Sequence, residues 1–146
     1  MIAVSTVGPE AAEEVHRLTQ AAFAGYDVLT PPSGALAETV DVVREHLTAQ
    51  PGAVAYLDGV PVGAARLIEQ EGHLHVRRVA VDPAYQGRGV CSALVRHVED
   101  AARAAGRTEL RCGVRDQLPG NRALFEHLGY TAVAQHDVWT ELTKRL

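Results

Sequence analysis

Cysteines, long apolar runs and signal-peptide features are scarce or absent in this sequence. Its 146 residues include two cysteines, Cys91 and Cys112, whose spacing fits no metal-ligand pattern. We therefore expect reduced thiols in a cytoplasmic protein, and no metal. No apolar run approaches the length of a membrane span, and the N-terminus shows no signal-peptide pattern. A membrane is accordingly not an expected partner.

An excess of positive charge is absent as well. Lys and Arg number 14 against 18 Asp and Glu, which gives a net charge of −4. This balance argues against nucleic acid as a main partner and is weakly compatible with a cationic amine ligand. Hydrophobic residues make up 47% and charged residues 22%, as in ordinary soluble proteins. We expect one domain over residues 1–146.

Apolar periodicity and turn signals predict alternating strands and helices. Strands are predicted over residues 2–7, 53–57, 60–67, 73–81 and 110–114, with two more between 130 and 142. Helices are predicted from Pro9, from Ser33 or Gly34, from Val90 and from Asn121. Within the helix from Val90, Glu99 is expected to pair with Arg103. This order predicts an α/β (α+β) fold, with one mixed, mostly antiparallel sheet and helices on both faces.

Residues 79–94 have a pattern typical of a phosphate-binding segment. A strand ends at Asp82-Pro83, the glycine-spaced run 86–89 (Gln-Gly-Arg-Gly) follows, and a helix begins at Val90. Glycines let a ligand approach the backbone, and the first N–H groups of a helix bind anions. No lysine lies near these glycines, which excludes a P-loop. The third glycine of a dinucleotide fingerprint is also missing. A plain strand–turn–helix connection is the alternative.

The run Gln-x-x-Gly-x-small after Val-x-Val resembles the coenzyme A loop of the GNAT superfamily of N-acyltransferases. Residues 121–130 resemble its second hallmark, Asn-x-x-Leu-Tyr-Glu-x-Leu-Gly-Phe, and the predicted element order is similar too. The resemblance implies an N-acetyltransferase that moves an acetyl group from acetyl-coenzyme A to a primary amine of a small molecule or peptide by direct attack. A non-catalytic acyl-coenzyme A-binding or regulatory module is the alternative.

The resemblance also implies the cofactor contacts. The strand backbone would hold the pantetheine arm, the N–H near Val81 would polarise the thioester carbonyl, and the loop amides would hold the pyrophosphate. Instead of contacting the cofactor, Asn121 could be the N-cap of a helix. Cys91 could be a thiol with a lowered pKa at a helix N-terminus instead of a small residue of the loop. Phe125 stands where the family has a tyrosine near the departing sulfur, and phenylalanine cannot donate a proton. The implied contacts are Val79, Ala80, Val81, Gln86, Gly87, Arg88, Gly89, Val90, Cys91, Ser92, Asn121 and Phe125.

The amine must lose a proton, so a base is expected near the central strand. Strand alternation places His75, Arg77, Val79 and Val81 on one face. His75 occupies the position at which the histone-acetylating branch of the superfamily carries a glutamate base, and its ordinary pKa suits the task. A strand histidine without a role is the alternative, and His136 and Asp137 are competing candidates. His73 and His75 together do not make a zinc site.

In the family, the first two helices and the last strands frame the acceptor pocket. The resemblance therefore implies that Tyr26, Asp27, Ser33, Glu38 and His136 bind the substrate. Phe23, Leu29 and Trp139 are alternatively candidates for a dimer contact, and a homodimer is left open because many members of the superfamily dimerise.

Overall fold

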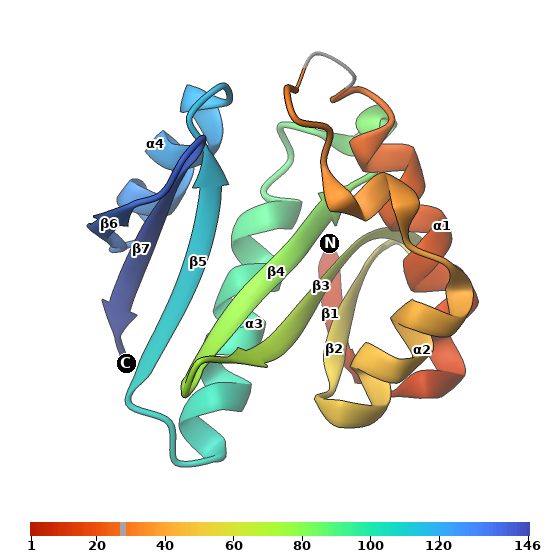
Figure 1. Ribbon diagram of the computed structural model, residues 1–146. Coiled ribbons are helices and arrows are strands. Elements are labelled where there is room, and N and C mark those ends of the chain that lie inside the picture. The colour runs from red at the N-terminus through yellow and green to blue at the C-terminus, as the bar shows by residue number, and fades with distance from the viewer. Residues whose placement is uncertain (27–28) are drawn as a thin grey trace.

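Seven strands form one sheet in the computed structural model of the protein, which describes residues 1–26 and 29–146 (Figure 1). The strands are β1 (Ile2–Val7), β2 (Gly52–Leu57), β3 (Val60–Gln70), β4 (His73–Val81), β5 (Glu109–Arg115), β6 (Thr131–Gln135) and β7 (Trp139–Arg145). The helices are α1 (Ala12–Phe23), α2 (Val40–Ala49), α3 (Val90–Ala104) and α4 (Pro119–His127). The predicted fold class and element order are confirmed.

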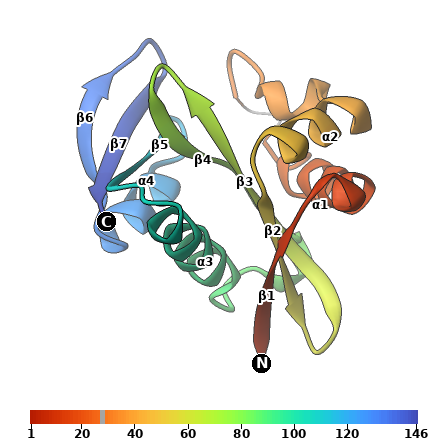
Figure 2. The same cartoon turned by 90° about the horizontal axis from the view of Figure 1, so that it is seen from below.

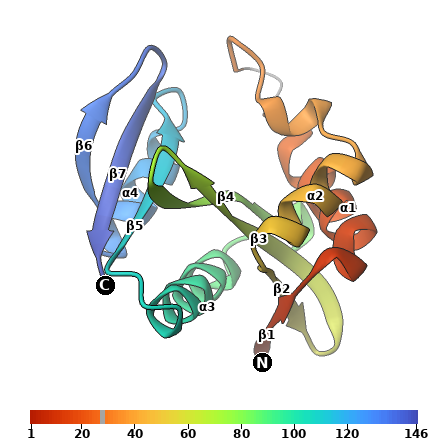
Figure 3. The same ribbon diagram turned by 60° about the horizontal axis from the view of Figure 1, so that its bottom comes forward.

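The sheet opens between β4 and β5. Its strand order is β1-β2-β3-β4-β5-β7-β6. In the described part of the chain β4 and β5 run parallel, whereas every other neighbouring pair is antiparallel. A single register pair, His75 with Arg111, joins β4 to β5. Beyond it the two strands diverge towards the C-terminal end of β4, as Figures 1 and 3 show.

Each face of the sheet has its own hydrophobic cluster. Figure 2 shows α1 and α2 on one face and α3 on the other. On the first face, Val15 and Leu18 of α1 pack with Val43 of α2 on Ala64 of β3. On the second face, α3 packs on the sheet through an apolar stripe at helical spacing, which includes Val90, Leu94, Val95, Val98 and Ala102. The two clusters hold the ends of α1 and α3 on opposite sides of β4.

A bulge at Arg78 reverses the alternation of β4. The register pairs Ala64 with Ala80 and Arg66 with Arg77, and Arg78 has a φ of 52°. Before the bulge, Val76 belongs to the α3-side cluster, and after it Val79 and Val81 pack against that same cluster. The prediction that His75, Arg77, Val79 and Val81 share a face is therefore wrong, because the extra residue moves the valines to the opposite face.

Three helix starts differ from prediction. Residues Pro9–Ala11 form a 3₁₀ turn, and α1 begins only at Ala12. The segment after Ser33 forms a short 3₁₀ turn (Gly34–Ala37), and α2 begins only at Val40, with the Thr39 side chain accepting from Val42 N–H. The chain is extended at Glu38, so the turn and α2 are separate elements. Helix α4 begins at Pro119, two residues before the predicted start.

The predicted pair of Glu99 with Arg103 is also wrong. Glu99 is buried, where it accepts a hydrogen bond from the Tyr130 hydroxyl at 2.9 Å and lies 3.1 Å from Lys144 Nζ. Arg103 instead donates to Asp100 at 2.8 Å. Helical spacing alone does not tell which of two adjacent carboxylates faces the interior.

Candidate functional site

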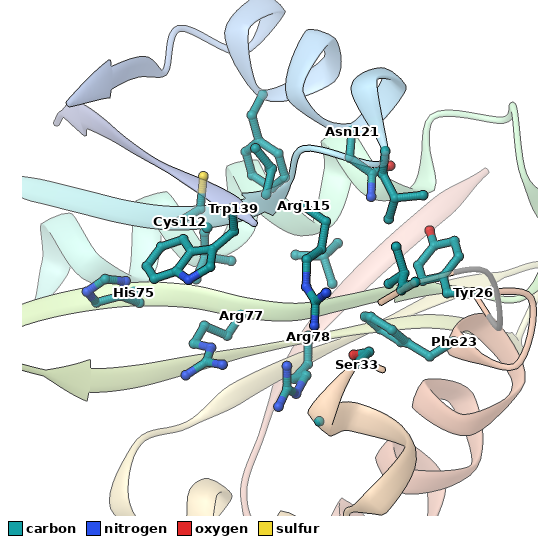
Figure 4. A pocket seen from close by; sticks show the side chains of 18 of the residues that line it. Phe23, Tyr26, Ser33, His75, Arg77, Arg78, Cys112, Arg115, Asn121 and Trp139 are labelled. Carbon is teal, nitrogen blue, oxygen red and sulfur yellow. The ribbon is translucent and has the colours of Figure 1, made fainter. Parts of the chain in front are cut away.

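Two cavities meet at the opening between β4 and β5. The loop cavity, of about 330 Å³, lies against residues 86–92 and the start of α3. The strand cavity, of about 350 Å³, lies between β4, β5 and the segment after α1 (Figure 4). Both are lined by Tyr26, Val79, Asn121 and Phe125. These four residues therefore mark the junction through which ligands in the two cavities could touch.

The loop cavity has the features of an anion site. Gly87 and Gly89 have φ values of 78° and 81°, which L side chains rarely adopt. A Cβ built at either glycine meets no atom within 4 Å, so the protein leaves this space open. The 15-residue helix α3 starts directly after Gly89, and its first N–H groups have no partner within the helix. A phosphate group would be held by these amides.

Most of the implied cofactor contacts line the loop cavity, namely Val79, Val81, Gln86, Gly87, Gly89, Val90, Cys91, Ser92, Asn121 and Phe125. Ala80 and Arg88 do not. Ala80 is buried in the sheet, and the Arg88 guanidinium lies over the Tyr85 ring at 5.4 Å. The sequence did not single out Ala22 and Leu124, which also line this cavity.

The backbone of β4 offers polar groups to the opening. Asp82 N–H donates to Val62 C=O at 2.8 Å, so this pair is hydrogen-bonded in the β3–β4 ladder. The next pair, Gly63 with Val81, is then of the non-bonded type, and the N–H of Val81 points away from β3. On that side β5 has already diverged, because its register pair with β4 lies at His75. Val81 N–H therefore faces the opening.

The structure changes the interpretation of three implied cofactor contacts, Cys91, Asn121 and Phe125. Burial raises the pKa of the Cys91 thiol to about 11, so the suggestion of a lowered pKa is wrong. Leu118 occupies the N-cap position of α4, so the alternative that Asn121 caps this helix is wrong too. Phe125 is buried and packs edge-on against Tyr130, with ring centroids 5.3 Å apart. The Tyr130 hydroxyl is bonded to Glu99 and does not replace the missing tyrosine.

The strand cavity brings together Tyr26, Ser33 and His75 from the candidates named above. Figure 4 shows His75 at the end of the cavity opposite Tyr26 and Asn121. His75 is 8% exposed, and burial is the main reason that its pKa is lowered. The negative charge of Glu141 opposes this shift, whereas the positive charges of Arg77 and Arg111 add to it. The imidazole is therefore neutral at pH 7 and can accept a proton.

The wall of the strand cavity is partly aromatic. Phe23, Leu29 and Trp139, the alternative dimer-contact residues, all line it. Trp139 lies over β5 because Gly113 has no side chain there: a Cβ on Gly113 would come within 2.8 Å of the indole. His136 stacks on Trp139 with ring centroids 4.0 Å apart, and it bonds to Glu141 at 3.0 Å. His136 thus supports the wall from behind rather than lining it.

Glu38 does not line the strand cavity either. Its carboxylate is bound by Arg66 at 2.7 Å and by Arg78 at 3.2 Å. Burial alone would raise the pKa of Glu38, but the hydrogen bonds and charges of Arg66 and Arg78 outweigh burial and hold it below its ordinary value. The competing base Asp137 is absent from both linings, and Asp27 lies outside the described residues.

Sequence reasoning did not assign the charged side chains that line the strand cavity. They are Arg77 and Arg78 from β4 and Arg115 from β5. The adjacent pair Arg77-Arg78 within a predicted strand was a usable signal, whereas Arg115 joins them only through the strand order. No Asp or Glu lines either cavity among the described residues, which counts against the weak expectation of a cationic ligand.

Within residues 1–26 and 29–146, no three His, Cys, Asp or Glu side chains form a group that could hold a metal ion. In the same part of the chain no helix is both long and apolar enough to cross a bilayer.

Two solved N-acetyltransferases share this fold. The PaiA N-acetyltransferase from Thermoplasma acidophilum, in complex with coenzyme A, has a TM-score of 0.84 at 14% identity, over 100% of this chain and 99% of that chain. A GCN5-related N-acetyltransferase from Rhodopseudomonas palustris has a TM-score of 0.78 at 26% identity, over 99% and 95% of the two chains. The fold is therefore that of an acetyltransferase.

The comparison of the sequence with family models shows the family. Residues 13–130 match the model of the acetyltransferase (GNAT) family, and the chain belongs to that family. The N-acetylaspartate synthetase of Xenopus tropicalis is 30% identical in an alignment of 119 positions that covers 77% of this chain and 44% of that protein. This chain thus spans less than half the length of that relative. The resemblance to the GNAT superfamily is confirmed.

Proposed function

We propose that the protein transfers an acetyl group from acetyl-coenzyme A to a primary amine of a small molecule or peptide by direct attack. The meeting of the two cavities at Val79, Asn121 and Phe125 carries this proposal. A thioester at this junction is accessible from the strand cavity, so an amine there needs no covalent enzyme intermediate. Holding both reactants in contact supplies a large part of the rate enhancement.

The loop cavity is the proposed site of the cosubstrate. The open space at Gly87 and Gly89, with the start of α3, fits a pyrophosphate. The backbone of Val79 and Val81 fits the pantetheine arm as an added strand, because β5 has diverged from this edge of β4. Val81 N–H would polarise the thioester carbonyl, since it faces the opening. Asn121 would contact the arm from α4.

Two side chains are proposed to move protons. His75 has the only imidazole or carboxylate among the described residues that line either cavity, and it is neutral at pH 7. Because it lies away from the junction, the proton of the amine would reach it through water in the strand cavity (Figure 4). Tyr26 lines both cavities, and its hydroxyl would protonate the departing thiolate in place of the tyrosine missing at Phe125.

The related proteins support acetyl transfer but not one acceptor. The relative from Xenopus tropicalis is named for an N-acetylated product, and the structure from Thermoplasma acidophilum contains coenzyme A. A second relative, the mycothiol acetyltransferase of Beutenbergia cavernae, is named for a different compound. The chemical class of the acceptor must therefore be inferred from the residues that line the strand cavity of this chain.

A non-catalytic acyl-coenzyme A-binding module is the second candidate, and Phe125 is the observation that favours it. The test is thiol release from acetyl-coenzyme A against a panel of amino acids, amines and peptides, with binding followed by calorimetry. Turnover of any amine supports transfer. Tight binding without turnover of any amine supports the module, and absence of binding refutes both.

A further inference from the structure

The strand cavity is lined by three guanidinium groups and no carboxylate of the described residues. Figure 4 shows the side chains of Arg77 and Arg78, from β4, and of Arg115, from β5, entering this cavity. Arg77 and Arg78 act electrostatically on each other, and Arg66 adds positive charge behind them. Three cations from two strands that are far apart in sequence thus converge on the space proposed for the acceptor.

The partners that the described residues provide do not balance the charge of these arginines. Glu38 is shared between Arg78, at 3.2 Å, and the buried Arg66, at 2.7 Å. Among the described residues, Arg115 donates to neutral acceptors, the carbonyl oxygens of Pro31 and Pro32, at 2.7 and 3.2 Å. Arg77 donates to the neutral side chain of Gln70 at 3.3 Å. Within residues 1–26 and 29–146, the carboxylate of Glu38 is therefore shared by two guanidinium groups, and those of Arg77 and Arg115 have neutral hydrogen-bond partners.

Arg77, Arg78 and Arg115 are partly buried, and partial burial of a positive charge without an anion is unfavourable, a cost that an anionic ligand would offset. Burial and the neighbouring Arg78 lower the pKa of Arg77, and the negative charge of Glu38 opposes this shift. An arginine fork matches the two oxygens of a carboxylate and binds it through two parallel hydrogen bonds. The side chains suited to this task already line the cavity, and Arg78 Nη2 lies 3.2 Å from the Cβ position built on Gly34.

We propose that the acceptor is a small amine that carries a carboxylate, the class that includes the amino acids, and that Arg77, Arg78 and Arg115 bind this carboxylate. The inference rests on the proposed acetyl transfer and names its substrate class. A volume of about 350 Å³ lies near the lower end of ligand pockets, which span about 300–1,000 Å³, and so fits a small molecule.

The same positive charge would assist the reaction. An ammonium group near guanidiniums has a lowered pKa, because like charges disfavour its charged form. The fraction of neutral amine at pH 7 therefore rises once the carboxylate is bound and the amine points to the junction at Val79. The arginines thus orient the acceptor and also lower the cost of removing its proton.

Binding is tested with an anion that cannot be acetylated. Succinate and its neutral analogue succinamide are titrated into coenzyme A-loaded protein by calorimetry, and into free protein in parallel. We expect a dissociation constant for succinate at least tenfold below that for succinamide. Equal affinity for the two compounds would overturn the anion site, whether or not coenzyme A binds.

Arg77→Gln is the informative variant, because the hydrogen-bond partner of Arg77 in the described part of the chain is the neutral Gln70, whereas loss of Arg78 would remove a partner of the buried Glu38. It is expected to weaken succinate binding at least tenfold, with unchanged affinity for coenzyme A. Arg96→Gln removes an exposed arginine of α3 and is the matched control, with unchanged binding of both. Succinate binding by Arg77→Gln as tight as in the wild type would overturn the assignment.

Turnover is tested with pairs of amino acids and their carboxamides. The α-amine next to an uncharged carboxamide or peptide bond has a pKa of only about 7.7–8.0, so its chemistry alone favours the carboxamides. We nevertheless expect kcat/KM at least 100-fold higher for the amino acids. Equal turnover of both overturns the inference and leaves acetyl transfer standing. Succinate binding without turnover of any amine overturns acetyl transfer and leaves the anion site standing.

Discussion

Glu38 and Arg66 form a buried ion pair, with Glu38 Oε1 2.7 Å from Arg66 Nη2 and side-chain exposures of 7% and 1%. Arg66 also lies 2.9 Å from His46 Nδ1 of α2, and Arg78 of β4 shares the carboxylate. The pair therefore joins the segment between α1 and α2 to the two central strands. One wall of the strand cavity depends on it, since Arg78 is held there by Glu38.

Replacing Glu38 by Gln is expected to destabilise the fold. The free energy of unfolding should fall by about 3–5 kcal/mol, the usual cost of removing one partner of a buried pair. Urea denaturation at pH 7 measures the change. Glu13→Gln, at an exposed position of α1, is the control and should change stability by less than about 0.5 kcal/mol. Equal losses in the two variants would contradict the structural role of Glu38.

The same ion pair predicts an acid limit to stability. Since the pKa of Glu38 is lower in the folded protein than its ordinary value, its stabilisation is complete above the unfolded pKa of about 4.3. The stabilisation is lost as the pH falls through the folded pKa. The difference in unfolding free energy between wild type and Glu38→Gln should therefore shrink from pH 5 to pH 3. A difference that stays constant over this range would contradict the prediction.

The loop between β4 and α3 was predictable because its signals are local. Asp82-Pro83, the glycines at 87 and 89 and the periodicity from Val90 each act within a few residues, and the structure places α3 at Val90–Ala104. The bulge at Arg78 was not predictable, because it depends on pairing with β3 across the sheet. The convergence of Arg115 on Arg77 was not predictable either, since it requires β5 to lie beside β4.

The loop glycines allow a test with a matched control. Gly89 and Gly59 both have a φ of 81°, and a Cβ at either meets no atom within 4 Å, but Gly59 lies in the β2–β3 turn far from both cavities. Glutamate at either position should therefore cost a similar backbone strain of about 1–2 kcal/mol. Only Gly89→Glu places a carboxylate in the loop cavity, and we expect it to abolish acetyl-coenzyme A binding in calorimetry. Normal binding by folded Gly89→Glu would refute the assigned cosubstrate site.

Tyr26→Phe tests the proposed proton donor. The change keeps the ring, which packs edge-on against Phe23 at 5.2 Å, and removes only the hydroxyl. General acids contribute about 10²–10⁴-fold, but a thiol of pKa about 8.5 leaves tolerably without one, so we expect kcat to fall by about tenfold. The KM for acetyl-coenzyme A should not change. Tyr56→Phe, on β2, serves as the control, and an unchanged kcat in Tyr26→Phe would exclude the role.

His75→Gln tests the proposed proton acceptor. In the wild type, kcat/KM should fall with decreasing pH as the imidazole becomes charged, at a pH below the ordinary histidine pKa of about 6.5, because burial lowers the pKa of His75. His75→Gln should lose this acid limb and turn over about 10²-fold more slowly, the lower end of the range for a general base. Coenzyme A affinity should be unchanged, because His75 does not line the loop cavity. His127→Gln, at an exposed position of α4, should keep the wild-type profile. If His75→Gln keeps it as well, His75 is not the proton acceptor.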